Sequence, residues 1–242
     1  MTRLPQSRHR FTAVLAASAL IAAILISASQ ISARSAKQGA TATTLTRSPS
    51  ASTGNSFAAG IAQHGAALGS PSAPLTLVEY ADLQCPYCGR WARETLPILV
   101  DRYVRGRKLR IVFNGMAFVG PDSDKALRTV VAAGRHDHLW EVVHGLYENQ
   151  GAENSGWVTD ELVRKIVSGV RGLDGRKLLD ERWNNAVAPE ILRASNAARA
   201  VGVNSTPSFQ LGPTGGSLEL IQLSSLGPEG IVPAIEKALA AR

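Results

Sequence analysis

The sequence of 242 residues predicts an α/β fold in which a βαβ half and a ββα half are separated by an α-helical insertion. Three observations support this order of elements. Short runs of β-branched and aromatic residues lie on either side of one helical segment in the first half. Apolar residues at helical spacing then continue from about residue 120 to residue 201. Two further apolar runs and an amphipathic segment complete the chain.

The first half begins with the run LTLVEY at residues 75–80, which we interpret as a buried strand. A helix is predicted to follow from Cys85 to about residue 103. Pro86 lies in its first turn, where a missing N–H is tolerated, whereas Pro97 lies inside the helix and should kink it. The run at residues 108–113 is the second strand. A strand–helix–strand unit implies that its two strands are parallel neighbours.

The insertion, at about residues 120–201, has room for four helices. Thr159 and Asp174 are of the residue types that cap helix N-termini, and Gly202 is placed to end the last helix. Two of the helices show apolar residues at helical spacing: Leu139, Val142, Val143 and Leu146, and Leu162, Val163, Ile166 and Val167.

The ββα half follows the insertion. Residues 207–211 and 218–223 are predicted strands on either side of a glycine-rich turn. Residues 229–241 form an amphipathic pattern that predicts a final helix.

The amino terminus carries the features of an export signal. Residues 11–26 contain no charged residue, and Arg3, Arg8 and Arg10 precede them. Extended to residue 31, the apolar stretch is long enough to span a bilayer. We therefore predict a signal anchor over residues 1–31 and a single-pass protein of the cell membrane, with its catalytic domain outside the cytoplasm. Small residues near the end of this stretch could equally serve as a signal-peptidase site. The alternative is therefore a cleaved signal peptide and a secreted or periplasmic protein.

Residues 32–64 are rich in Ser, Thr, Ala and Gly, which predicts a flexible tether before a folded domain at residues 65–242. The leader and the tether also account for the charge of the chain. Residues 1–64 hold six of the 26 basic residues and none of the 19 acidic residues, so the remainder has 20 basic against 19 acidic residues. The high pI therefore does not indicate a nucleic-acid partner.

Cys85 and Cys88 are the only two cysteines, and the C-x-x-C spacing places both sulfurs on one helical turn. A disulfide that closes so short a loop removes little entropy from the unfolded chain, so a structural role is disfavoured. A zinc site would need two further ligands, and no second C-x-x-C supplies them. His136, His138 and His144 are interpreted as surface histidines. In an exported chain the cysteine pair indicates redox chemistry, with no metal and no cofactor.

Cys85 caps the predicted helix, so its sulfur should face unpaired backbone N–H groups and the positive end of the helix dipole. Both effects lower the pKa of the thiol, which makes Cys85 the candidate sulfur that forms mixed disulfides. Cys88, one turn later, is expected to be more buried and to act as the partner sulfur. Pro86 and Tyr87 lie between the two cysteines, and both are candidates for contact with substrate; the alternative for Tyr87 is that its ring simply covers the end of the helix.

Three segments together resemble the DsbA-like thiol:disulfide oxidoreductases of the thioredoxin superfamily. They are LGSPSAPLTLVEYADLQCPYCG at residues 68–89, LWEVVHGLYEN at 139–149 and AVGVNSTPSF at 200–209. They are similar to the entry strand and active-site turn of that family, a helix of its insertion and the segment with its cis-proline. The resemblance covers about residues 65–242 and implies a thioredoxin-like fold with a helical insert.

Two positions depart from the family pattern. The dipeptide between the cysteines is Pro-Tyr, where the best-known oxidase of the family has Pro-His, and Ser205 stands where glycine is often found. The dipeptide helps to set the stability of the thiolate, so the redox potential is left open.

The resemblance also assigns roles to residues outside the cysteine motif. Glu79 matches a buried acid that moves protons to and from the inner cysteine, and an ordinary strand-end carboxylate at the surface is the alternative. Pro207 matches the cis-proline, which would place backbone groups of Thr206 beside the cysteines for pairing with an extended substrate segment. The alternative for Pro207 is an ordinary trans-proline in a strand.

These features predict an extracytoplasmic thiol:disulfide oxidoreductase that donates disulfides to reduced or misoxidised exported proteins. The resemblance implies that a quinone-linked membrane partner re-oxidises it. One alternative is a reductase or isomerase of the same fold, supplied by a reducing partner. A second alternative is a non-redox peptide-binding or chaperone module.

Overall fold

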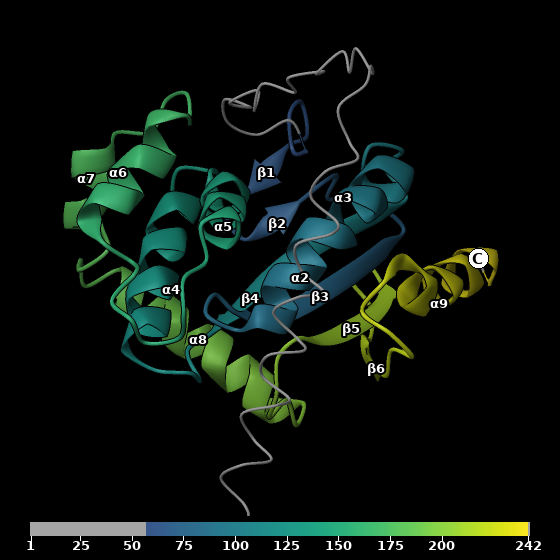
Figure 1. The fold of residues 1–242 in the computed structure, drawn as a ribbon. Coiled ribbons are helices and arrows are strands. Elements are labelled where there is room, and N and C mark those ends of the chain that lie inside the picture. The colour runs from purple at the N-terminus through teal and green to yellow at the C-terminus, as the bar shows by residue number, and fades with distance from the viewer. Residues whose placement is uncertain (1–56, 242) are drawn as a thin grey trace, which may run out of the picture. The chain divides into compact units, whose positions relative to one another are not determined.

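A six-stranded sheet forms the centre of the computed structural model, which describes residues 57–241 (Figure 1). The strands in this part of the chain are β1 (Gln63–His64), β2 (Ala67–Leu68), β3 (Leu75–Asp82), β4 (Leu109–Met116), β5 (Ser208–Pro213) and β6 (Glu219–Ile221). Their order across the sheet is β1-β2-β4-β3-β5-β6. The predicted anchor at residues 1–31 and the first part of the predicted tether lie outside the described residues.

The two central strands, β3 and β4, run parallel, and their pairing continues along all eight residues of each strand. The other pairings in the described sheet are antiparallel. Parallel strands need a crossover connection, which is made here by α2 (Pro86–Glu94), α3 (Leu96–Leu99) and a π-helical turn, η1 (Val100–Val104). The predicted βαβ half is therefore confirmed, although both strands continue beyond their predicted ends.

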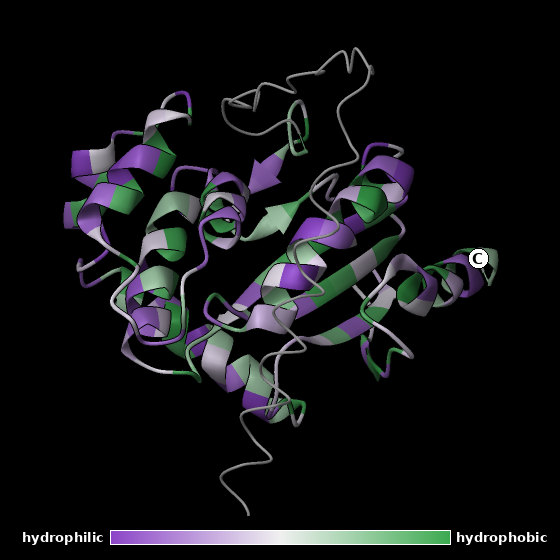
Figure 2. Cartoon of the chain, viewed as in Figure 1, coloured by the Kyte–Doolittle hydropathy of each residue, from purple (hydrophilic) through white to green (hydrophobic). Residues whose placement is uncertain are grey.

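The core lies on both faces of β3. Seven of the eight β3 residues are buried, which explains why the strand is a nearly continuous apolar run in the sequence. Hydrophobic residues lie along the central strands, and each helix also carries hydrophilic residues (Figure 2). The largest fully buried side chains include Trp91, Trp140, Tyr147 and Phe209.

The helix that follows the cysteines is broken near Pro97, as predicted. The break comes at Thr95, two residues before the proline, and separates α2 from α3. Pro97 has no N–H with which to continue the helical hydrogen bonds. The Thr95 hydroxyl instead donates to the carbonyl of Leu226 at 2.6 Å, which ties the break to the C-terminal half of the fold.

The insertion contains five helices within the described residues, one more than predicted. They are α4 (Pro121–Gly134), α5 (Leu139–Glu148), α6 (Asp160–Ser168), α7 (Gly175–Glu181) and α8 (Val187–Ala200). In Figure 1, α4–α7 gather on one side of the sheet. The predicted caps are confirmed, since Thr159 accepts a hydrogen bond from the N–H of Leu162 and Asp174 accepts two at the start of α7. Gly202 has φ +76° just beyond α8, which supports the predicted helix stop.

The ββα half is also confirmed. Strand β5 pairs with β3 and then with β6, and α9 (Pro228–Ala240) closes the fold. Strand β5 begins at Ser208, one residue later than predicted, since Pro207 has no N–H to donate to a neighbouring strand.

The folded domain begins before residue 65, so the predicted tether extends too far. The side chain of Arg105 donates hydrogen bonds to the carbonyls of Phe57 and Ala59, both at 2.8 Å. The ring of Phe57 lies 4.9 Å from the ring of His144, and Ala58 is buried. This packing could not be predicted, because residues 51–62 are mostly Ala, Ser, Gly and Thr and show no apolar pattern. Within residues 57–241, no helix combines the length and apolar character that crossing a bilayer requires.

Candidate active site

The two cysteines lie at the N-terminus of α2, directly after the C-terminal end of β3. Cys85 is the N-cap of the helix, with φ −65° and ψ 120°, and Pro86 is its first residue. Both cysteines are free thiols, and Cys85 is slightly exposed whereas Cys88 is fully buried. The structure therefore places the cysteines as the sequence predicts, with one sulfur nearer the surface than the other.

The environment of Cys85 stabilises its thiolate and lowers its pKa from 9.0 to about 6. The largest contribution is a hydrogen bond from the Cys88 thiol, which outweighs the opposing effect of burial. The backbone N–H groups of Cys88 and Tyr87 and the side chain of Thr206 lower the pKa further. A thiolate at a helix N-terminus is thus the stable form of Cys85 at neutral pH.

Cys88 has the opposite character. Burial raises its pKa well above the ordinary value of 9.0, and the hydrogen bond and charge of Cys85 raise it further. The nearby carboxylate of Glu79 acts in the same direction. Cys88 is therefore a neutral thiol at neutral pH, so the two sulfurs have distinct chemical roles.

Glu79 is buried in the middle of β3 rather than exposed at its end. Its strand neighbours are Phe113 on β4 and Phe209 on β5, and the ring of Phe209 lies 4.3 Å from the ring of Trp91. Burial raises the pKa of the carboxyl from 4.5 to about 8, an effect that the Trp91 side chain partly offsets. Among the described residues, neither Oε1 of Glu79 nor Nε1 of Trp91 has a partner that meets the distance and angle of a hydrogen bond. Such an acid can hold or release a proton near neutral pH.

The loop before β5 completes the site. The Thr206–Pro207 peptide bond is cis, and the thiol of Cys85 donates to the Thr206 carbonyl at 3.4 Å. A hollow of about 220 Å³ lies beside this loop, lined in part by Pro207, Phe209 and Leu220. Tyr87 is exposed over 62 % of its surface, so its ring faces solvent next to the cysteines.

One residue of the site was not found from the sequence. Asp82 ends β3 and is fully buried, with four hydrogen bonds to its carboxylate. Oδ1 accepts from the N–H of Gln84 and the hydroxyl of Ser123, and Oδ2 accepts from the N–H groups of Phe118 and Val119. Asp82 thereby fixes the turn that leads into the cysteines. Its sequence position indicates only the end of a strand.

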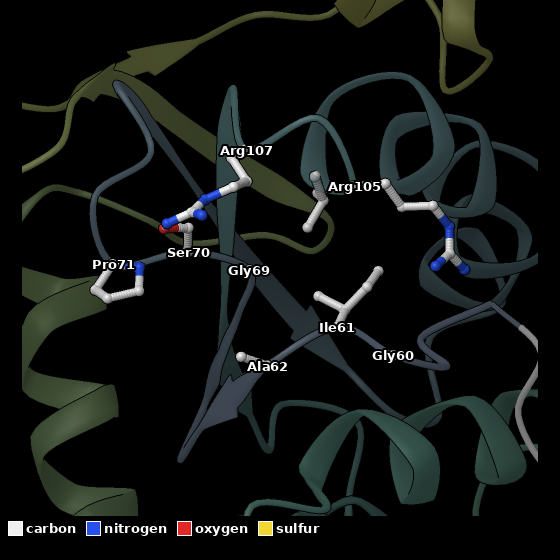
Figure 3. Close-up of a pocket in the computed structure, with 9 residues that line it drawn as sticks. Gly60, Ile61, Ala62, Gly69, Ser70, Pro71, Arg105 and Arg107 are labelled. Carbon is white, nitrogen blue, oxygen red and sulfur yellow. The ribbon is translucent and has the colours of Figure 1, made fainter.

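A larger cavity, of about 510 Å³, lies away from the cysteines (Figure 3). It is lined by Gly60, Ile61, Ala62, Gly69, Ser70, Pro71, Val104, Arg105 and Arg107. These residues precede the starts of β3 and β4, whereas Cys85 follows the end of β3. A strand of this length spans roughly 25 Å, so the cavity is separate from the redox site.

Two of the three histidines singled out in the sequence lie beside carboxylates. His136 lies 2.5 Å from Glu181 and His138 lies 3.6 Å from Glu141. Among residues 57–241, no group of three or more His, Cys, Asp or Glu side chains is arranged to hold a metal ion.

The fold and the site define a class of protein. A C-x-x-C pair that starts the helix of a βαβ unit, beside a cis-proline that precedes a ββα unit, characterises the thioredoxin-like disulfide oxidoreductases, here with a helical insertion. A family model described as thioredoxin matches residues 62–214. The chain belongs to this family, and its fold, including the helical insertion, is similar to that of solved DsbA-like structures.

Individual relatives agree with this assignment. The probable disulfide bond formation protein D of Bacillus anthracis is 27% identical over 144 residues, or 58% of this chain and 66% of that protein. The match thus spans just under two thirds of the relative's length. Oxidised BdbD from Bacillus subtilis has a TM-score of 0.65 at 20% identity, covering 74% of this chain and 97% of that one. A thioredoxin-like oxidoreductase from Silicibacter pomeroyi DSS-3 has a TM-score of 0.57 at 26% identity, covering 73% and 92%. These likenesses confirm the predicted fold.

Proposed function

We propose that this protein is an extracytoplasmic thiol:disulfide oxidoreductase that donates the Cys85–Cys88 disulfide to exported proteins. The observation that carries the proposal is the difference between the two sulfurs. The stabilised thiolate of Cys85 favours the reduced state of the pair, and a pair whose reduced state is favoured passes its disulfide readily to other proteins. The names of the Bacillus relatives, disulfide bond formation proteins, support the same direction.

The transfer proceeds through a mixed disulfide. A client thiolate attacks Cys85, a bond forms between the client sulfur and the Cys85 sulfur, and the Cys85–Cys88 bond breaks. Cys88 leaves with the electron pair and takes up a proton. A second client thiolate then attacks the client sulfur of the mixed disulfide and releases Cys85 as a thiolate. The client loses two electrons, which the enzyme pair gains.

Glu79 supplies the proton that Cys88 needs. With a pKa of about 8, the carboxyl is largely protonated at neutral pH, and it lies close enough to Cys88 for its charge to affect that thiol. Re-oxidation reverses the transfer, and Glu79 then takes a proton back. Glu79 thus acts as a general acid in one direction and as a general base in the other.

Client segments bind along the loop that contains the cis-proline. The Thr206 backbone lies beside Cys85, so it can pair with an extended segment next to the attacked sulfur. The hollow beside Pro207 can receive a client side chain, and Pro86 and Tyr87, next to Cys85, also contact the client.

The direction of transfer is tested by two measurements on the full-length protein. We expect a reduction potential well above that of thioredoxin, about −270 mV, in equilibrium with glutathione. We also expect rapid oxidative refolding of a reduced client and weak reduction of insulin. A potential near that of thioredoxin with strong insulin reduction would identify a reductase or isomerase. Retention of client binding without either activity would identify a peptide-binding or chaperone module.

We further propose that the protein acts at the cell membrane, held by the segment at residues 11–31, and that a quinone-linked membrane partner re-oxidises it. The uncharged segment and the arginines before it support this location. An anchor raises the effective concentration of enzyme and partner in the same membrane.

Cell fractionation with sequencing of the mature amino terminus tests the location. We expect the intact protein in the membrane fraction, with the domain accessible from outside the cytoplasm. A soluble protein that begins near residue 30 or 34 contradicts the anchor and identifies a cleaved signal peptide. That outcome leaves the redox chemistry unaffected.

A further inference from the structure

Gln150 lies just after α5 and reaches from the insertion to the turn that carries Cys85. Its side-chain Nε2 donates to the carbonyl of Leu83 at 2.9 Å and to the carbonyl of Cys85 at 3.0 Å. The Cys85 carbonyl also accepts the first helical hydrogen bond, from the N–H of Gly89 at 3.0 Å. A single amide group from the insertion therefore holds the carbonyls of the two residues that flank Gln84.

The first turn of α2 leaves room for this amide. A Cβ atom at Gly89 would overlap Oε1 of Gln150 and would lie 2.9 Å from Nη1 of Arg93. Gly89 has an ordinary helical backbone, so a turn conformation does not explain the glycine. A side chain at this position would instead displace the Gln150 amide from the two carbonyls.

Further contacts attach the same part of the insertion to the turn. Nε2 of Gln84 donates to Oδ1 of Asn154 at 3.0 Å, and the N–H of Asn154 donates to Oε1 of Gln84 at 2.6 Å. The hydroxyl of Tyr147 donates to the carbonyl of Asp82 at 3.3 Å. Residues 147–154 thus hold the backbone at the end of β3 and at the start of α2.

We propose that Gln150 is a positioning residue that holds Cys85 in the conformation its reduced form requires and thereby raises the reduction potential of the pair. In the oxidised protein the disulfide itself joins Cys85 to α2. In the reduced protein that link is gone, and the Gln150 hydrogen bonds keep Cys85 as the N-cap, with its sulfur facing the N–H groups of Tyr87 and Cys88. The restraint therefore contributes more to the reduced form than to the oxidised form, and the proposal rests on the redox function of this cysteine pair.

The charge distribution of the amide acts in the same direction. One N–H of the amide points to the Cys85 carbonyl and offsets the negative end of that carbonyl dipole, which lies beside the thiolate. The insertion thus contributes to the redox site through a residue that holds the backbone of Cys85.

The test compares full-length variants. Gln150→Met keeps the length of the side chain and removes both donors, whereas Gln150→Glu places a negative charge against the two carbonyls. Asn149→Ala is the matched control, since Asn149 is the exposed neighbour of Gln150 and its side chain donates to the carbonyl of Gly145 in α5. The measurements are the equilibrium with glutathione, the absorbance titration of the Cys85 thiolate and thermal unfolding in both redox states.

We expect Gln150→Met to shift the glutathione equilibrium on the order of tenfold toward the disulfide, which corresponds to about 30 mV. The thiolate titration should move to higher pH, and Gln150→Glu should move both readouts further. Asn149→Ala should leave them unchanged. Equal loss of stability in both redox states, with an unchanged equilibrium and titration, would overturn the proposal. Because the equilibrium is measured with glutathione, the comparison holds whether the protein oxidises or reduces its clients.

Discussion

Replacement of Cys85 by serine is expected to reduce disulfide transfer to the uncatalysed rate. A hydroxyl oxygen cannot form the mixed disulfide, and no other cysteine lies outside the pair to replace it. The variant should fold normally, because serine also caps helices well and the side chain is nearly the same size. Oxidative refolding of a reduced client, followed by the recovery of client activity, measures the loss. Full activity in the Cys85→Ser protein would exclude the proposed chemistry altogether.

The matched control is Cys88→Ser. This variant keeps the reactive Cys85 thiolate but lacks the sulfur that resolves a mixed disulfide. Clients with a disulfide should therefore remain covalently attached to it, and the adducts should appear on non-reducing gels and disappear with reductant. Adducts on Cys85→Ser instead would reverse the roles assigned to the two cysteines.

Replacement of Glu79 by glutamine is expected to stabilise the reduced protein and to slow its catalysis. The folded-state pKa of Glu79, about 8, lies above the unfolded value of 4.5, so the folded protein holds this proton over a pH range in which the unfolded chain releases it. The contribution of Glu79 to stability therefore falls as the pH rises from 4.5 to 8. By pH 7 the loss is roughly 3 kcal/mol, at 1.36 kcal/mol for each pKa unit. Glutamine does not ionise and avoids this loss.

Urea unfolding of the wild-type and Glu79→Gln proteins at several pH values measures the effect. The difference in unfolding free energy should be small near pH 4.5 and should widen toward pH 7 in favour of the variant. Disulfide transfer should fall by about 100-fold, a typical loss for removal of a general acid or base. A stability difference that does not change with pH would contradict the raised pKa of Glu79. Unchanged transfer would remove Glu79 from the proton path.

Elements with a clear periodic pattern could be predicted from the sequence, and short elements could not. Strand β3 was predictable because burial on both faces produces a continuous apolar run. Strands β1 and β2 have two residues each, too few for any alternation to appear. The insertion was expected to hold four helices rather than five, although Asp174, the cap of the seven-residue helix α7, was recognised.

Some residues of the candidate site could likewise be predicted from the sequence, and others could not. Cys85 and Cys88 could be found because their chemistry and spacing are local, and Pro207 because the segment around it resembles a known family. Gln150 could not be found, since it is 65 residues from Cys85 in the sequence and its role depends on where the insertion folds back. Asp82 is next to the motif, but its four hydrogen-bond donors come mainly from later segments.

The short hairpin of β1 and β2 has a consequence for the exposed edge of the sheet. Strand β2 pairs with Ile111 and Val112 of β4, and the Ala66 carbonyl accepts from the N–H of Phe113. Without it, β4 becomes an edge strand with a row of open backbone donors and acceptors, which is a template for strand addition by a second molecule. A chain shortened to begin at Gly69 retains the whole redox site, yet it exposes this template. The few residues before β3 thus protect the domain against edge-to-edge aggregation.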